Sequence, residues 1–585
     1  MEKPLTRRRT NARRSAALLL TGICGLASWN LAESPAKATL IVTNARIYTV
    51  DAKQPWAEAL AIGGDRILAV GSKAAVEAFR DRNTNVIDAH GKLVLPGFTD
   101  SHIHLLEGSK TLTQVDLNGT TSIAEVQKRV KEFAATHPQA KWILGRGWSY
   151  DIFGDAALPD KKFLDEVVPN RPVYLVGYDG HTSWVNSRAL AITGIARDTP
   201  DPPNGSIVKD AKGDPTGALN EDADDLVGSK IVDSRAEMLA ALRLGLREAN
   251  KAGLTRVICL GNSIAAVDDG SHLELYEDLL KNGELTLRMY VSTFQGPPKM
   301  SAEQIAEVVA RKNKYHGDWL TVGAVKFYMD GVIESHTAAM LTPYSDDPKQ
   351  TGSLRWDERE YKKDVAELDK LGIQVFTHAI GDRAVRLALD AYQDAAKTNG
   401  TRDLRHRIEH IETITAADIP RFGALGVVAS YQPLHAEPND DTMKVWVRNA
   451  GEDRASRAWT WQSVAKSGGR LAFGSDWPVV TLSPWAGVQN AVTRQTLEGK
   501  PEGGWIPGER VTLEQAIEAY TLGAVFSAHR EASEGSLEAG KLADLIVLDQ
   551  DLFKIAPSEI HKTKVLLTMV GGKVVYQVSE MAGGK

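Results

Sequence analysis

Two histidines at the end of an apolar segment are the first residues of this sequence that could do chemistry. His102 and His104 close the segment Pro96-Gly-Phe-Thr-Asp-Ser-His-Ile-His104. In a β-strand, side chains two residues apart point to the same face, so both imidazoles would point to one side. Imidazole nitrogens are common ligands of zinc and similar divalent ions. The segment therefore predicts part of a metal site at the end of a strand.

Further side chains that can bind metal end other β-rich segments much later in the chain. They are His378 in Thr377-His378, His410 in Arg407-Ile-Glu-His410 and Asp476 in Phe473-Gly-Ser-Asp476. Each of these histidines alone is more simply explained as a buried side chain that is hydrogen-bonded to a backbone carbonyl. Four histidines and an aspartate at the same ends of strands are harder to explain separately. The set predicts a divalent metal centre.

Lys326 lies inside the apolar segment Val322-Gly-Ala-Val-Lys-Phe-Tyr328. A lysine ammonium has a pKa near 10.4 and cannot bind a metal at neutral pH. A free charge would also be costly to bury in such a segment. The position favours a functional reason, and a salt-bridged lysine is the alternative.

The composition restricts which chemistry is available. Of 585 residues, 43% are hydrophobic and 25% are charged, which is typical of a globular protein. The formal net charge of −6 argues against a general nucleic-acid-binding protein. The two cysteines, Cys24 and Cys259, are too few for a disulfide framework or a cysteine-rich zinc site. Histidine and carboxylate must therefore carry any metal chemistry.

The middle of the chain alternates short β-branched segments with amphipathic helical segments, which is typical of βαβ units. We predict strands near residues 97–103, 254–260, 287–293, 322–329, 373–378, 405–410, 427–432 and 471–475. Eight such units favour an α/β fold with a closed (β/α)8 TIM barrel, whose active site lies at the carboxyl ends of its strands. Residues 361–371 are predicted to be one of the helices, because Val365, Leu368 and Leu371 recur at helical spacing.

The remaining segments predict the domain organisation. Both ends of the chain are β-rich, so residues 39–95 and 531–585 are expected to pack together as a small β-sandwich domain around a barrel of residues 96–530. About 150 residues separate the first and second barrel strands, too many for one crossover. An inserted subdomain is therefore expected at about residues 105–250, with strands near 142–145 and 173–176.

Residues 1–38 have the layout of a secretory signal. A basic segment precedes an apolar run at residues 15–29, which is shorter than the ~20 residues that span a bilayer, and Ala36-Lys-Ala38 resembles a cleavage site. The arginine pairs indicate a twin-arginine signal and export to a bacterial periplasm. A membrane anchor, a disordered tail and, with Cys24, a lipoprotein are the alternatives. After removal of the signal no membrane segment is expected.

The chain resembles the amidohydrolase superfamily, and within it the amidohydrolase 3 branch that includes N-substituted formamide deformylase-like enzymes. The resemblance rests on the segment that ends in His104, on Ser475-Asp-Trp-Pro478, on Gly145-Arg-Gly-Trp148 and on Ala539-Gly-Lys-Leu-Ala-Asp544. It implies a centre with two divalent ions, expected to be Zn²⁺, in which a lysine converted by CO₂ to a carbamate bridges the ions. Carried over to this chain, the implied ligands are His102, His104, Lys326, His378, His410 and Asp476. Without the carbamate, a site for one metal remains.

We expect a metal-dependent hydrolase that cleaves a non-peptide C–N bond of a small molecule, such as an amide, N-formyl or N-acyl bond. A metal-activated hydroxide would attack the carbonyl, while Asp476 would take up a proton and pass it to the leaving amine. A deaminase or lactonase on the same barrel is an alternative, and so is a non-catalytic exported protein that binds metal. His181 and His435 are expected to stabilise the transition state. Trp148, Tyr150 and His336 are the candidate substrate-binding residues, and a homo-oligomer is left open.

Overall fold

Eight parallel strands form the sheet on which the candidate ligands lie. The structure is a computed structural model that describes residues 37–153, 158–178, 182–202, 205–221, 223–261 and 272–581. The strands are β8 (Phe98–Ile103), β15 (Leu254–Cys259), β16 (Arg288–Gln295), β17 (Leu320–Tyr328), β18 (Gln374–Ala379), β19 (Arg407–His410), β20 (Val428–Tyr431) and β21 (Arg470–Phe473). Their order in the sheet is their order in the chain. Each strand lies within two or three residues of its predicted position.

The sheet closes into a barrel where the segment after β21 returns to β8. The N–H of Asp476 donates to the carbonyl of His102 at 2.7 Å. A side chain at Gly474 would place its Cβ 2.5 Å from the backbone nitrogen of His102, so only glycine fits this close approach. The predicted (β/α)8 barrel is therefore confirmed.

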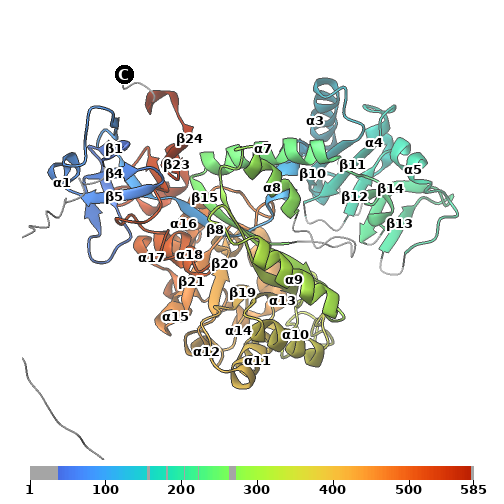
Figure 1. The fold of residues 1–585 in the computed structure, drawn as a ribbon. Coiled ribbons are helices and arrows are strands. Elements are labelled where there is room, and N and C mark those ends of the chain that lie inside the picture. The colour runs from blue at the N-terminus through green and yellow to red at the C-terminus, as the bar shows by residue number, and fades with distance from the viewer. Residues whose placement is uncertain are drawn as a thin grey trace, which may run out of the picture. The chain divides into compact units, whose positions relative to one another are not determined.

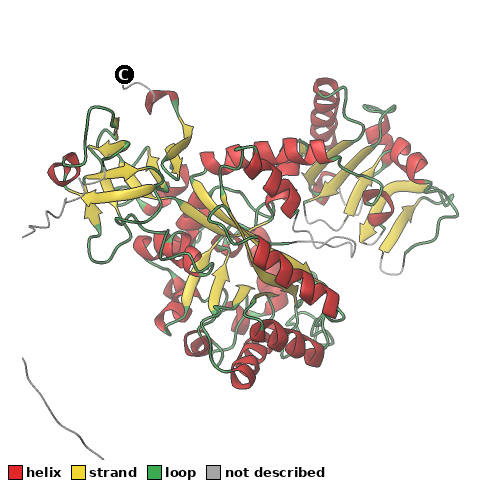
Figure 2. Ribbon diagram, in the orientation of Figure 1, coloured by secondary structure: helices red, strands yellow, loops and turns green. Residues whose placement is uncertain are grey.

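Helices cover the outside of the barrel strands (Figures 1 and 2). The helices that follow barrel strands include α8 (Leu273–Lys281), α9 (Ala302–Lys314), α10 (Glu358–Lys370), α11 (Asp382–Asn399), α12 (Ile419–Leu425), α15 (Trp461–Lys466), α16 (Pro484–Thr493), α17 (Leu513–Tyr520) and α18 (Leu522–Phe526). Helix α10 begins at the N-cap Asp357, whose side chain accepts from two backbone N–H groups, and it buries Val365 and Leu368. The predicted helical segment 361–371 lies in α10 except for Leu371, which caps the end of the helix and is 41% exposed.

The two ends of the chain form a β-sandwich, as predicted. One sheet joins β24 (Lys573–Gln577), β23 (Val565–Val570), β22 (Leu545–Leu548), β7 (Leu93–Pro96), β2 (Arg46–Tyr48) and β3 (Trp56–Ala57). The other joins β5 (Arg66–Gly71), β4 (Ala59–Gly63), β1 (Leu40–Thr43) and β6 (Asn85–Asp88). Side chains of both sheets share one hydrophobic cluster that includes Val42, Leu60, Val94 and Val547. Figure 1 shows the N-terminal and C-terminal strands side by side.

The segment between β8 and β15 carries its own six-stranded mixed sheet. The strands are β9 (Val115–Asp116), β10 (Ile143–Trp148), β11 (Val173–Gly177), β12 (Thr182–Val185), β14 (Pro215–Glu221) and β13 (Gly205–Lys209). Helices α3 (Ile123–Thr136), α4 (Lys161–Asp165) and α5 (Ser187–Thr193) accompany them, and α7 (Arg235–Lys251) leads into β15. Within the part of the chain that the structure describes, no helix is both long enough and apolar enough to cross a membrane. Residues 1–36 of the predicted signal lie outside the described residues.

Candidate metal centre

Asp476 lies at the centre of a group of histidines at the carboxyl ends of the barrel strands. Its Oδ1 is 3.2 Å from Nε2 of His102 and 3.2 Å from Nε2 of His104. Its Oδ2 is 3.8 Å from Nε2 of His435 and 4.0 Å from Nδ1 of His410. Three of these histidines and the aspartate were predicted metal ligands, and His435 was predicted as a catalytic residue. The structure brings all five together.

The five residues form two sets of three that could each hold a metal ion. His102, His104 and Asp476 form one, and His410, His435 and Asp476 form the other, each with one ligand atom per residue within 4.8 Å of the others. Nδ1 of His410 and Nε2 of His435 are buried and have no hydrogen-bond partner among the described residues. An unpaired buried polar group costs about 1–3 kcal/mol. A cation beside Asp476 would pair Nδ1 of His410, so the donor set of imidazole and carboxylate fits a divalent metal.

The ionisation states of these groups also suit metal binding. Burial lowers the pKa of His410 well below its ordinary value, and it lowers the pKa of His435 as well. Burial alone would raise the pKa of Asp476, but His102, His104 and His410 together lower it well below its ordinary range. Neutral imidazole and ionised carboxylate are the forms that ligate metals.

A buried ion pair orients His102. Its Nδ1 is 2.8 Å from Oε2 of Glu409, and Arg407 donates to both oxygens of that carboxylate at 2.8 and 2.9 Å. Burial would raise the pKa of Glu409, but Arg407 and His102 lower it well below its ordinary value. Such a carboxylate fixes the imidazole so that Nε2 faces the metal site. Sequence reasoning missed Glu409; its signal was an arginine and a glutamate two residues apart on the strand that ends in His410.

The backbone near the ligands adopts conformations that side chains rarely tolerate. Asp476 has φ 62° and His410 has φ 74°, both in the left-handed region. Such strain costs about 1–3 kcal/mol for each residue and occurs most often at functional sites. Buried Asp100 holds the segment before Asp476, since it accepts from the backbone N–H and the hydroxyl of Ser475, at 3.0 and 2.5 Å. Burial raises the pKa of Asp100 to about 6.

Lys326 and His378 lie beside the two sets without completing either. Lys326 is buried on β17, where burial lowers its pKa to about 8 although Glu409 and Asp476 act to raise it. The ring of His378 is centred 4.5 Å from that of His410, but its Nε2 lies 3.4 Å from the carbonyl of Gly331. Both predicted ligands therefore adjoin the centre, and their role as ligands stays a prediction.

The predicted substrate-binding residues lie in other surroundings. Trp148 is fully buried in the hydrophobic cluster of the insertion, and its indole N–H donates to the carbonyl of Leu175. The hydroxyl of Tyr150, also in the insertion, donates to Oγ1 of Thr182. Nε2 of His336 lies 2.9 Å from Oδ1 of Asp346, and its ring packs against the ring of Tyr344. His181 lies outside the described residues. The roles of Trp148, Tyr150 and His336 in substrate binding stay predictions.

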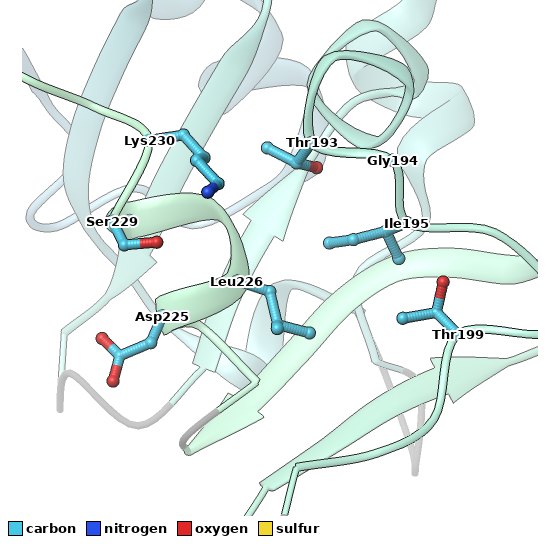
Figure 3. A pocket seen from close by; sticks show the side chains of 9 residues that line it. Thr193, Gly194, Ile195, Thr199, Asp225, Leu226, Ser229 and Lys230 are labelled. Carbon is cyan, nitrogen blue, oxygen red and sulfur yellow. The ribbon is translucent and has the colours of Figure 1, made fainter.

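An open cavity of about 660 Å³ lies in the insertion (Figure 3). Its lining combines the end of α5 and the following turn with the segment around Leu226. Asp225 and Lys230 are its charged residues, and none of the predicted site residues lines it. This cavity is therefore separate from the candidate metal centre.

Comparison with known proteins agrees with this centre. The profile of the Amidohydrolase family matches residues 85–576. The chain belongs to the amidohydrolase family. Protein LONG AFTER FAR-RED 3 of Arabidopsis thaliana is 35% identical to this amidohydrolase over 92% of each chain. The N-substituted formamide deformylase of Arthrobacter pascens is 29% identical over 92% of this amidohydrolase and 98% of its own length, which supports the amidohydrolase 3 branch.

A solved structure resembles this amidohydrolase over nearly its whole length. It is the crystal structure of an uncharacterized metal-dependent hydrolase from Pyrococcus horikoshii, with a TM-score of 0.72 and 25% sequence identity. The match covers 88% of this amidohydrolase and 99% of the other chain. The fold and the family together identify a hydrolase of the metal-dependent amidohydrolase type.

Proposed function

We propose that this amidohydrolase cleaves a non-peptide C–N bond of a small molecule, in a formamide or another N-acyl amine. The observation that carries the proposal is the position of Asp476 between two pairs of histidines, two of whose buried nitrogens have no protein partner among the described residues. The relative named N-substituted formamide deformylase supports the choice of bond.

We infer that two Zn²⁺ ions bind at this centre. His102, His104, His410 and Asp476 would hold them, with His378 and a carbamate on Lys326 as further ligands. Bound ions of this kind lower the pKa of water and polarise a carbonyl group. Burial lowers the pKa of Lys326 to about 8, so a larger share of it is the neutral amine that reacts with CO₂ than for an exposed lysine. With ¹³C-bicarbonate, wild-type protein should show a carbamate resonance that Lys326→Met lacks.

The side chains around the centre have distinct roles in this proposal. A carboxylate oxygen of Asp476 would accept a proton from the attacking water and deliver it to the leaving nitrogen, since an unprotonated amide nitrogen leaves poorly. His435, which lies 3.8 Å from Asp476, would donate a hydrogen bond to the carbonyl oxygen as negative charge develops on it. Glu409 would keep His102 in position.

The test is a substrate panel that distinguishes this reaction from its alternatives. Purified protein with its metal content measured is offered N-substituted formamides, N-acetyl amines, an aminated heterocycle and a lactone. Release of formate or another acid together with a primary amine supports the proposal. Release of ammonia would identify a deaminase, and ring opening of the lactone a lactonase. A protein that contains zinc but turns over none of these compounds would support a binding role.

We also propose that residues 1–38 direct export through the twin-arginine route. The support is the basic segment with arginine pairs, followed by a short apolar run. The full chain is expressed in a bacterium, and N-terminal sequencing of the periplasmic protein should begin at Thr39. Replacing both arginine groups, Arg7, Arg8 and Arg9 together with Arg13 and Arg14, with lysine should keep the chain in the cytoplasm, whereas export of that variant would contradict the proposal.

A further inference from the structure

Gln432 is a buried side chain whose polar atoms the proposed mechanism does not use. It follows strand β20 and is 1% exposed. Neither its Oε1 nor its Nε2 has a hydrogen-bond partner among the described residues. Buried amides are almost always hydrogen-bonded, so a side chain with both atoms unpaired needs an explanation. We propose that Gln432 binds the amide group of the substrate, an inference that rests on the proposed function.

The direction of the Gln432 side chain follows from its neighbours on the same strand. Oγ of Ser430 lies 3.3 Å from Oγ of Ser101 on β8, although β21 separates these two strands in the sheet. The two hydroxyls therefore meet inside the barrel. Tyr431 points the other way, toward Trp461 on outer helix α15. Gln432 has extended φ and ψ of −110° and 92°, so its side chain points inward, closer than Ser430 to the carboxyl end.

The chain around Gln432 leads directly to the candidate metal centre. Its carbonyl accepts from the N–H of His435, within the short helix η2 (Pro433–Ala436). On the neighbouring strand, the N–H of Gly474 donates to the carbonyl of Tyr431, two residues before Asp476. Gln432 thus lies on the inner face of the barrel, three residues before His435. The strand beside it leads to Asp476.

The chemistry of a glutamine side chain matches that of a secondary amide or formamide. Its Nε2 donates and its Oε1 accepts, while the substrate offers a carbonyl oxygen and an N–H. In a trans amide the N–H and the carbonyl oxygen point to opposite sides, so Gln432 would pair the N–H through its Oε1, which orients the C–N bond relative to Asp476. A site built to hydrogen-bond an N–H discriminates strongly against a compound that lacks it. Gln432 is therefore expected to favour amides over esters.

Gln374 offers a matched control at the opposite end of the barrel. This buried glutamine begins strand β18, and both its amide atoms are paired inside the protein. Its Oε1 accepts from the hydroxyl of Tyr290 at 2.8 Å, and its Nε2 donates to the carbonyls of Ser527 and Arg405. One glutamine thus has protein partners and the other has none among the described residues.

The experiment compares Gln432→Met with Gln374→Met, using N-butylformamide and butyl formate as probes. For Gln432→Met we expect an unchanged or higher Tm, unchanged zinc content, and at least about a 10-fold loss of kcat/KM on the formamide, mainly through KM. The loss on the ester should be smaller. Gln374→Met should lower Tm by at least about 2 °C and leave KM unchanged, because it leaves protein groups unpaired.

Three outcomes would overturn the inference. The first is a fall in Tm for Gln432→Met as large as for Gln374→Met, which would show a structural role. The second is wild-type KM for the formamide in Gln432→Met, which would show that the side chain does not touch the substrate. The third is a wild-type enzyme that cleaves no amide of the panel; this removes the proposed function as well, whereas the first two leave it intact.

Discussion

The two ends of the barrel treat their buried polar groups differently. At the amino ends of the strands, Gln374 is fully paired, and Arg288 donates to both carboxylate oxygens of Asp544 at 2.7 and 3.1 Å. At the carboxyl ends, His410, His435 and Gln432 each have a buried polar atom without a partner among the described residues. The first end stabilises the fold, and the second keeps groups available for a ligand. Substitutions at the two ends should therefore separate stability from activity.

The largest effect is expected at the carboxyl end, for Asp476→Asn. The amide keeps an oxygen near the four histidines but cannot accept and return a proton, so kcat should fall by about 10²–10⁴-fold. The Tm should change little, because the neighbouring histidines remain in place. Turnover of the best substrate and zinc content are measured together. Activity close to wild type would exclude Asp476 as the proton acceptor.

At the amino end, Arg288→Met should have the opposite profile. It leaves Asp544 buried without its cationic partner, which should cost about 3–5 kcal/mol of unfolding free energy in urea. The kcat of the folded fraction should stay at the wild-type value. Replacing both partners, in Arg288→Met with Asp544→Asn, should recover much of the loss, since no unpaired charge remains. A fall in kcat without a fall in stability would contradict the division between the two ends.

The barrel could be predicted from sequence because its signal is local. Most residues of the parallel strands are buried, most of the strands are short β-rich segments, and amphipathic helices lie between them. The end of a helix is set by a few residues, so the predicted segment 361–371 ran one residue past the end of α10. The sandwich was predictable only as two β-rich ends, because the pairing of Leu545 with Pro96 joins residues that are far apart in sequence.

The candidate site was predictable where the predicted ligands lie at or just after the ends of strands, as His102, His410 and Asp476 do. The hydrogen bonds behind them were not, because a buried glutamate such as Glu409 looks like any charged residue until its partners are known. Gln432 has no signal of its own in a single sequence. What distinguishes it is the lack of a partner among the described residues, and that is a property of the folded chain.

Removing metal should affect the carboxyl end alone. Bound metal stabilises the folded state by about 2.7 kcal/mol when its free concentration is 100 times its Kd. Chelation should therefore abolish turnover and lower Tm, and zinc should restore both. In Arg288→Met the Tm should fall by a similar further amount on chelation, because Arg288 lies at the opposite end of the barrel from the candidate metal centre. An unchanged Tm after complete removal of zinc would show that the histidine nitrogens do not hold metal.

The smallest effect is expected for the comparison of two buried histidines on neighbouring segments. His406, just before β19, is paired: its Nδ1 accepts from the N–H of Val375 at 3.0 Å, and its Nε2 is 3.2 Å from Asp369. His435 has a free Nε2 among the described residues. His435→Gln should lower kcat by up to about 10²–10³-fold, the scale of one lost transition-state hydrogen bond, with Tm nearly unchanged. His406→Gln should lower Tm and leave kcat unchanged. If His435→Gln loses stability while its kcat is kept, His435 belongs with the structural groups of the other end.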